Sequence, residues 1–351
     1  MNDRFLRACR REPVDTTPVW FMRQAGRYMA EYRAIRQRYS LLEICAQPEL
    51  AVTVTLQPVN AIAVDAAILF SDLLIPLAPM GLPFDFVKGE GPSIEAPIRS
   101  ASDVGRLHPF EPREALRHVL ETIRLLRAEL TGRVPLIGFG GAPFTLAAYA
   151  IEGGPSSNYA LTKAFMYSEP HAWHRLCDLF AEIMADYLRA QVEAGAQALQ
   201  VFDSWAGALG RSDYREFALP HTARILQSLR ALGVPVIHFG VGTTAILPDM
   251  AAGADVVGLD WRQPLDEAWE SIGPGHAVQG NLDPTLLLGP RERLFGAASD
   301  IVRRAGGRPG HIFNLGHGIL PNTRLENVQA LAEHVHEAGR TQAIPNAEVR
   351  T

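Results

Sequence analysis

Lysine is nearly absent from this chain of 351 residues. Lys88 and Lys163 are the only lysines, and arginine supplies the other 31 of the 33 basic residues. With 38 acidic residues the formal net charge is −5 at pH 7, which argues against a generally basic nucleic-acid-binding protein. It leaves room for a local arginine cluster that binds carboxylate or phosphate, because a planar guanidinium fits both groups. A genomic codon bias is the simpler explanation for the excess of arginine over lysine. The positions of the arginines in the chain must distinguish this bias from a functional cluster.

Cysteine and long apolar runs are scarce as well. Cys9, Cys45 and Cys177 lie far apart and form no Cys-x-x-Cys pair, which argues against a disulfide framework and for a reducing compartment. The opening residues, MNDRFLRACRREP, lack the apolar core of a secretory signal. Polar residues interrupt the longest apolar stretch, and a membrane span needs about 20 apolar residues. We therefore expect a cytoplasmic protein without a membrane span.

Several motifs of known chemistry are missing. The chain has no P-loop, no G-x-S-x-G elbow and no His/Cys/Glu spacing typical of a metal site, so we expect no metal. HFGVGTTA at 238–245 formally matches a dinucleotide fingerprint, with Asp260 following the next apolar run. Because it falls in the fifth strand–helix unit rather than the first, a glycine turn at a barrel mouth is the favoured interpretation.

Short, continuous apolar runs recur along the whole chain, and such runs are typical of strands buried on both faces of a parallel sheet. Amphipathic segments at 112–130, 170–195, 213–233 and 324–339 read as helices between them. Eight strands alternating with helices predict a (β/α)8 TIM barrel of the α/β class, with a doubly wound sheet as the alternative. The runs are 18–22, 66–70, 134–139, 198–202, 234–239, 255–259, 276–280 and 311–315.

No linker or change of composition divides the chain. We expect one domain over residues 1–340 and a frayed tail over 341–351. After the second strand, between Pro76 and Pro112, the sequence predicts a helix-free excursion with a hairpin around Gly89–Gly91. It lies over the barrel mouth either as a lid or as a loop packed on the rim, and the sequence leaves both open.

Barrel enzymes build their sites at the carboxyl ends of the strands. Polar residues and glycines just past each run are therefore site candidates. They are Arg23, Asp72, Gly140–Gly141, Asp203–Ser204, Gly240, Asp260, Asn281 and His317.

The arginines concentrate at the start of the chain, where the first 40 residues hold nine against four acids. In RQAGR, Arg23 and Arg27 bracket Gly26, so both guanidiniums can converge on one anion. Tyr32, Arg33 and Arg36 follow at helical spacing, and a solvated helix face is the simpler interpretation for Arg38.

Asp72 and His317 are the other candidates of note. Asp72 ends a buried strand, so its carboxylate must be functional or paired with a neighbouring arginine. His317 lies between two glycines that expose its ring, which suits a hydrogen-bond donor or a general acid. His334 and His336, on the last helix, are more simply surface residues.

Six segments resemble one family closely, the uroporphyrinogen decarboxylases of haem and tetrapyrrole biosynthesis. They occur in the family's order and span nearly the whole chain. Ala30 departs from the family pattern, because the family usually has proline at this position. The difference bears on the rigidity of the loop. The segments are PVWFMRQAGRYM (18–29), ILFSDLL (68–74), KGEGPSI (88–94), GAPFTLAAYAIEGG (141–154), VFDSWAGAL (201–209) and NLGHGILP (314–321).

The resemblance implies a cofactor-free, usually dimeric (β/α)8 carboxy-lyase. Such an enzyme converts the four acetate side chains of uroporphyrinogen III to methyl groups, which gives coproporphyrinogen III and four CO2. Tyr149, which by spacing alone looks like a core aromatic, joins the site only through the resemblance. The implied substrate-binding residues are Arg23, Gln24, Ala25, Gly26, Arg27, Arg36, Asp72, Tyr149, Ser204 and His317.

The resemblance also implies roles. Protonation of a pyrrole ring carbon makes a cation that accepts the electrons left by CO2. Asp72 accepts from the pyrrole N–H groups and stabilises that cation. Tyr149, Ser204 and His317 hydrogen-bond the substituent carboxylates. Arg23 is the candidate proton donor, although a guanidinium with a pKa above about 12 needs a carboxylate or water to relay the proton.

Two alternatives of other classes remain. The related barrel methyltransferases need a His and Cys zinc cluster at strand ends, whereas the three cysteines here fall in helical or N-terminal segments. A non-catalytic tetrapyrrole carrier keeps the arginines but has no need of Asp72.

Overall fold

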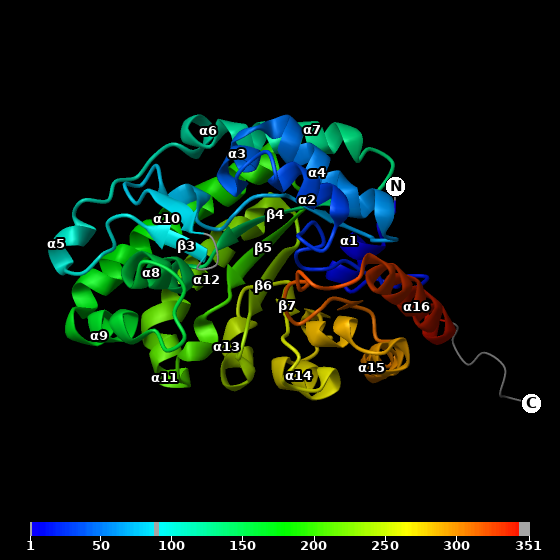
Figure 1. The fold of residues 1–351 in the computed structure, drawn as a ribbon. Coiled ribbons are helices and arrows are strands. Elements are labelled where there is room, and N and C mark those ends of the chain that lie inside the picture. The colour runs from blue at the N-terminus through cyan, green and yellow to red at the C-terminus, as the bar shows by residue number, and fades with distance from the viewer. Residues whose placement is uncertain (1, 88–90, 344–351) are drawn as a thin grey trace, which may run out of the picture.

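The computed structural model describes residues 2–87 and 91–343 and shows a curled parallel sheet surrounded by helices (Figure 1). Within these residues the sheet has seven strands in the order β1-β4-β5-β6-β7-β8-β9, and all neighbouring strands are parallel. Seven of the eight predicted apolar runs contribute one strand each, which confirms the α/β class. The strands are β1 (Ala67–Ile68), β4 (Leu136–Gly141), β5 (Ala198–Asp203), β6 (Val236–Gly240), β7 (Val256–Gly258), β8 (Ala277–Gln279) and β9 (His311–Ile312).

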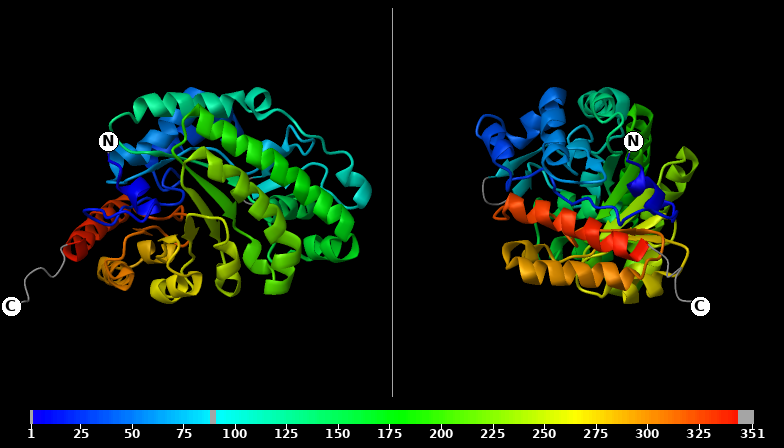
Figure 2. Two further views of the ribbon diagram at one scale, coloured as in Figure 1. Left: turned by 180° about the vertical axis from the view of Figure 1, so that it is seen from behind. Right: turned by 90° about the vertical axis from the view of Figure 1, so that its right-hand side faces the viewer.

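Helices cover the outside of the sheet, and Figure 2 shows α15 and α16 side by side. The predicted helices 170–195 and 324–339 are continuous, as α10 and α16. The helices are α1 (Arg4–Cys9), α2 (Ala30–Arg36), α3 (Leu41–Ala46), α4 (Pro48–Ala61), α5 (Ala101–Val104), α6 (Pro112–Ala115), α7 (Arg117–Glu129), α8 (Pro143–Glu152), α9 (Ala160–Ser168), α10 (Pro170–Ala194), α11 (Arg211–Asp213), α12 (Leu219–Leu229), α13 (Leu247–Met250), α14 (Leu265–Ile272), α15 (Arg291–Ala305) and α16 (Leu325–Ala343). None of the described helices is long and apolar enough to cross a membrane.

Three helical details differ from the sequence predictions. The segment 213–233 is divided, with a π-helix, η3 (Tyr214–Ala218), before α12, because Pro220 has no N–H for a regular helix to use. The short helix α5 lies in the region expected to be free of helix. Helix α16 runs to Ala343, past the expected start of the frayed tail at Thr341, and residues 344–351 lie outside the described residues.

The first apolar run, 18–22, forms no regular strand. Val19 makes a single parallel bridge to Phe313, and the segment lies between β9 and β1. Side chains rather than a backbone ladder accept most of its N–H groups, which explains why strand geometry is lost. Val19 N donates to Asp65 Oδ2 (2.7 Å), Trp20 N to the Phe313 carbonyl (3.3 Å), Phe21 N to Gln24 Oε1 (3.1 Å) and Met22 N to Asn314 Oδ1 (3.0 Å).

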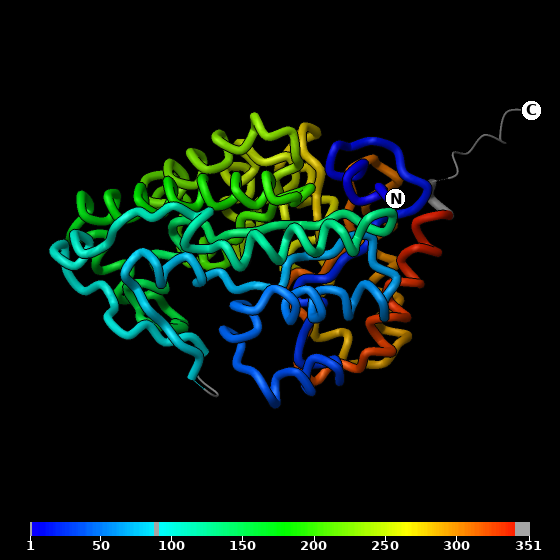
Figure 3. Tube along the Cα trace, turned by 90° about the horizontal axis from the view of Figure 1, so that it is seen from above, coloured from blue at the N-terminus to red at the C-terminus, as the bar shows by residue number. Residues whose placement is uncertain are grey.

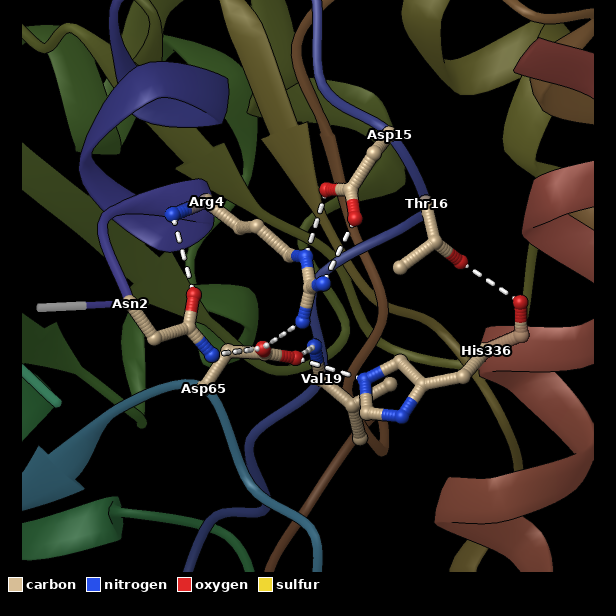
Figure 4. Close-up of polar contacts among 7 residues, drawn as sticks. All are labelled: Asn2, Arg4, Asp15, Thr16, Val19, Asp65 and His336. Carbon is tan, nitrogen blue, oxygen red and sulfur yellow. Dashed lines mark hydrogen bonds and ion pairs between the residues drawn. The ribbon is translucent and has the colours of Figure 1, made fainter. Parts of the chain in front are cut away.

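Asp65 joins both ends of the chain to this segment (Figure 4). Besides Val19 N, this buried carboxylate accepts from Asn2 Nδ2 (2.5 Å), Arg4 Nη1 (3.4 Å) and His336 Nε2 (2.7 Å). The expectation that His336 is a surface residue is therefore wrong, because its half-buried ring is held by a carboxylate far away in the sequence. The network fixes the first segment of the chain against the last helix.

A second, antiparallel sheet pairs β2 (Phe84–Val87) with β3 (Gly91–Ile94). Residues 88–90, which carry most of the turn expected around Gly89–Gly91, lie outside the described residues. This sheet lies at the end of the molecule that holds α8 and α9 (Figures 1 and 3). Ile94 N donates to the Gly153 carbonyl (2.8 Å) and Ile98 N to the Ala150 carbonyl (2.9 Å), so the excursion packs on the last turn of α8.

Candidate active site

Arg23 is the centre of the polar group that the fold assembles past the carboxyl ends of the strands. Its charge acts on the pKa values of Asp72, Tyr149 and His317, which places its guanidinium within electrostatic range of all three. These residues follow β1, β4 and β9, so four distant segments meet at one edge of the sheet. The structure thus groups four of the ten substrate-binding residues that the resemblance implies.

The backbone of Arg23 is unusual. Its φ of 60° lies in the left-handed region, which costs a non-glycine residue roughly 1 kcal/mol or more and is common at functional sites. The preceding Met22 is held on both sides, because its N–H donates to Asn314 Oδ1 and its carbonyl accepts from Ile319 N (2.9 Å). The strained turn therefore presents an exposed guanidinium from a fixed position.

Asp72 is half-buried and has little compensation for its charge. Oδ1 accepts from Leu74 N (2.9 Å), and no described Lys, Arg or His lies within ion-pair distance. Burial raises the pKa of Asp72, and the Leu74 N–H and the more distant charge of Arg23 oppose that rise only in part. A cation placed beside Asp72 would relieve the cost of its charge. The alternative, in which Asp72 forms a structural salt bridge with a neighbouring arginine, is therefore not found among the described residues.

Tyr149 lies on α8, and its ring packs against Trp205 with 3.8 Å between centroids and 34° between the ring planes. Tyr159 contacts the same tryptophan at 5.0 Å. Burial and the charge of Asp72 raise the pKa of Tyr149, so its hydroxyl remains a proton donor. Helical spacing alone did not distinguish Tyr149 from a core residue, because Trp205, whose ring orients it, comes from the loop after β5.

His317 is a neutral donor in this arrangement. Its Nδ1 accepts from Gly318 N (2.7 Å), so the ring proton belongs on Nε2. Burial, followed by the charges of Arg23 and Arg262, lowers the pKa of His317 to about 4. Above that pH the half-buried imidazole offers one N–H to a ligand.

Ser204 follows β5 directly and is half-buried. Its hydroxyl makes no hydrogen bond with another described residue. The next residue is fixed, because Trp205 N donates to Thr145 Oγ1 (3.3 Å). The Ser204 hydroxyl is therefore available beside the Tyr149–Trp205 pair.

The RQAGR segment contributes in two ways. The Gln24 amide is committed to the backbone, because Oε1 accepts from Phe21 N and Nε2 donates to the Ala66 carbonyl (3.1 Å). Ala25 and Gly26 continue the turn, half-buried, and Arg27 is exposed. Arg36, on α2, donates to the Tyr39 carbonyl (2.7 Å) and is half-buried. The two arginines keep guanidinium donors for an anion.

Two other strand-end residues support loops. Asp260 accepts from Gly242 N (2.5 Å) and Arg262 N (3.0 Å), and Asn281 Nδ2 donates to the carbonyls of Asp260 (2.8 Å) and Gln263 (2.7 Å). The acidic residue of the formal dinucleotide fingerprint is therefore bonded to its own glycine turn. This arrangement agrees with the preference for a glycine turn.

Metal ligands are not grouped in residues 2–87 and 91–343: no set of three or more His, Cys, Asp or Glu side chains there could hold an ion. The three cysteines are buried and unpaired, in α1, α3 and α10.

Solved structures show the same fold. A methyltransferase from Methanosarcina mazei superposes with a TM-score of 0.80 at 23% identity, over 96% of this chain and 98% of that chain. A B12-independent methionine synthase from Shewanella sp. gives 0.55 at 12% identity, over 84% of this chain and 86% of its own. At such identities the likeness concerns the fold alone.

Comparisons of the sequence identify the family as well as the fold. Residues 1–338 match the family model described as uroporphyrinogen decarboxylase (URO-D). A uroporphyrinogen decarboxylase from Sorangium cellulosum is 58% identical over 341 residues, which is 97% of each chain. Another from Carboxydothermus hydrogenoformans is 56% identical over 338 residues, 96% of this chain and 97% of the relative. The chain therefore belongs to the uroporphyrinogen decarboxylase family.

Proposed function

We propose that this chain is a carboxy-lyase that removes CO2 from the four acetate side chains of uroporphyrinogen III and leaves coproporphyrinogen III. Its place in the family supports the reaction class. The observation that carries the substrate class is Asp72, a half-buried carboxylate within electrostatic range of Arg23 but without an ion-pair partner among the described residues. Such a carboxylate stabilises a cation that forms next to it.

The reaction requires that cation. Direct loss of CO2 from a pyrrole acetate would leave an unstabilised carbanion. When a proton first adds to the neighbouring ring carbon, the pyrrole becomes an iminium-type cation that accepts the electron pair of the breaking C–C bond. The exocyclic methylene carbon left by CO2 then takes up a proton and the ring carbon gives one up, so each acetate becomes a methyl group with a net uptake of one proton. Asp72 accepts hydrogen bonds from the pyrrole N–H groups and lowers the energy of this cation electrostatically. The substrate supplies its own electron sink, so the proposal includes no cofactor and no metal.

Neutral donors and arginines hold the eight carboxylates of the macrocycle. Tyr149, Ser204 and His317 offer hydroxyl and N–H donors, and the raised pKa of Tyr149 and the lowered pKa of His317 keep both groups neutral. Arg27 and Arg36 add charge at the edge of the site, Ala25 and Gly26 line it, and the buried Gln24 amide holds the turn in place. Neutral donors bind a carboxylate without adding a positive charge that would compete with the cationic ring for Asp72.

Arg23 is our candidate proton donor. Its charge acts on both Asp72 and His317, which supports a place for it in proton delivery, and the raised pKa of Asp72 suits this carboxyl to act as a relay. A guanidinium gives up its proton only transiently, so a carboxylate or water must return one to it in each cycle.

The overall architecture is part of the same proposal. The segment 18–22 acts as the eighth element that closes a (β/α)8 barrel, supported by its bridge to Phe313 and its bonds to Asp65. Residues 1–340 form one domain, the antiparallel excursion β2/β3 covers the rim near α8, and the enzyme works in the cytoplasm as a homodimer. Analytical ultracentrifugation that gives a monomer at micromolar concentration would contradict the last point.

Anaerobic incubation of the protein with reduced uroporphyrinogen III tests the function directly. We expect four equivalents of CO2 and a product with four carboxylates, detected by mass spectrometry after oxidation. Tight binding without CO2 release would instead indicate a tetrapyrrole carrier and overturn the proposal. Dialysis against a chelator serves as the metal control, and activity should survive it.

A further inference from the structure

Three buried polar atoms without a hydrogen-bond partner belong to Asp203, which precedes Ser204 of the candidate site, and to two residues that interact with it. They are Asp203 Oδ2, at the end of β5, His238 Nε2, on β6, and the hydroxyl of Tyr214, at the start of the π-helix η3. Asp203 and His238 are fully buried, and their facing atoms are 3.8 Å apart. Asp203 acts on the pKa of Tyr214, so the phenol lies within electrostatic range of the same carboxylate.

Strand register explains why the two side chains meet. Val201 pairs with His238 and Phe202 with Phe239. Because side chains alternate along a strand, Asp203 and His238 share one face, and Phe202 and Phe239 contact each other on the opposite face. The pair therefore lies between the sheet and the outer helices.

The hydrogen bond on the far side of the imidazole determines what Nε2 presents. His238 Nδ1 lies 2.9 Å from the Met250 carbonyl, and a carbonyl only accepts, so Nδ1 carries a proton. A neutral His238 would then direct the Nε2 lone pair at a carboxylate oxygen. Two acceptors that face each other in a fully buried site repel, and each would remain without a hydrogen bond.

We propose that Asp203 and His238 form a buried carboxylate–imidazolium pair, and that this pair positions the Trp205–Tyr149 aromatic pair of the active site. The connection runs through Thr145 at the start of α8. Its hydroxyl donates to Asp203 Oδ1 (3.0 Å) and accepts from Trp205 N (3.3 Å), and the Trp205 ring packs against Tyr149. Asp203 and His238 are thus positioning residues that do not touch the substrate.

The other groups around the pair do not supply the positive charge. Tyr214 from η3 and Cys177 from α10 lie within electrostatic range of Asp203, and burial raises the pKa of each, so both remain neutral. Asp249 also acts on Tyr214, but it is itself paired with Arg211 and Arg215. Among the described residues, His238 is the one cationic group within ion-pair distance of Asp203.

His311 provides a matched internal control. It is also buried, its Nε2 bonds the Gly280 carbonyl (3.1 Å) and its Nδ1 has no partner, but no described carboxylate lies within 4 Å of it. Burial lowers the pKa of His311 to about 4. The two histidines differ chiefly in whether a carboxylate faces the second nitrogen.

Nitrogen NMR of the 15N-histidine-labelled protein, without substrate, tests the imidazolium form of His238 at pH 8. We expect both nitrogens of His238 to be protonated, His311 to be neutral, and His238→Gln to assign the signal. In Asp203→Asn the amide donates to Nε2, so His238 should become neutral with the proton on Nδ1. A neutral His238 in the unmodified protein overturns the proposal.

The positioning role is tested by kinetics and rests on the proposed function, whereas the NMR measurement does not. Thr145→Val removes the connection and should lower kcat about tenfold with little change in KM, while His238 stays an imidazolium. Thr145→Ser retains the hydroxyl and should keep kcat within about twofold. An unchanged kcat in Thr145→Val overturns the positioning role, and a protein with no decarboxylase activity at all would contradict the proposed function instead.

Discussion

Arg23 packs its aliphatic chain against Gly318 so closely that a Cβ atom at position 318 would lie 2.4 Å from Arg23 Cδ. His317 precedes that glycine, and burial together with the charge of Arg23 lowers the pKa of His317. The two loops are joined by the bond from Ile319 N to the Met22 carbonyl. The contact between Arg23 and Gly318 therefore helps to place both the Arg23 guanidinium and the His317 imidazole. Only glycine at position 318 leaves room for this contact.

Gly318→Ala should consequently displace Arg23 and lower kcat at least tenfold, because a real Cβ does not approach another carbon to 2.4 Å. Steady-state CO2 release is the measurement. Gly296→Ala is the control: position 296 is within α15, and an added Cβ there meets no atom within 4 Å. That variant should keep full activity. Equal activity of both variants would contradict the role assigned to the Arg23–Gly318 contact.

Asp72→Asn should reduce CO2 release by at least 100-fold while the protein still folds and binds substrate, because the amide keeps the shape of the carboxylate and loses its charge. In the unmodified enzyme the raised pKa of Asp72 should appear as an acid limb, with kcat falling as the pH drops through a value above the ordinary aspartate pKa of about 3.9. Near-normal turnover of Asp72→Asn would remove this residue from the mechanism.

Most of the sheet could be predicted because its strands are buried on both faces and are therefore continuously apolar. The run 18–22 has the same composition, yet Asp65, Gln24 and Asn314 accept its N–H groups. Two of these acceptors come from distant parts of the chain, and no local pattern shows that side chains will replace the ladder.

In the candidate site, too, local features could be predicted from the sequence and distant contacts could not. Strand ends indicated Arg23, Asp72 and His317 because position along a barrel strand is a local property. The orientation of Tyr149 depends on Trp205, and the place of His336 depends on Asp65, which is 271 residues away. Both pairings join residues that are distant in the sequence, so helical spacing could not reveal them. From spacing alone, Tyr149 was interpreted as a core residue and His336 as a surface residue.

His317→Ala should let partly decarboxylated intermediates accumulate, because one donor that holds a substituent carboxylate is lost. His317→Gln should retain more activity, since its amide offers a neutral N–H. With the pKa of His317 lowered to about 4, its titration should not affect kcat between pH 6 and 9. Product profiles by liquid chromatography and a pH–rate profile check both points. An Ala variant with the normal profile would exclude His317 from substrate binding.

The last prediction concerns the Asp65 network and stability. Burial alone would raise the pKa of Asp65, but hydrogen bonds from His336, Val19 N and Asn2 outweigh it and lower the pKa. A carboxyl with a lowered folded-state pKa stabilises the fold above its unfolded pKa of about 3.9 and loses that contribution as the pH falls through the folded value. Asp65→Asn should therefore lower the free energy of unfolding by about 3 kcal/mol at pH 7 and flatten its acid dependence in urea titrations. Asp15→Asn, at an exposed partner of Arg4, is the control and should cost less than about 1 kcal/mol, and equal losses would argue against the buried network.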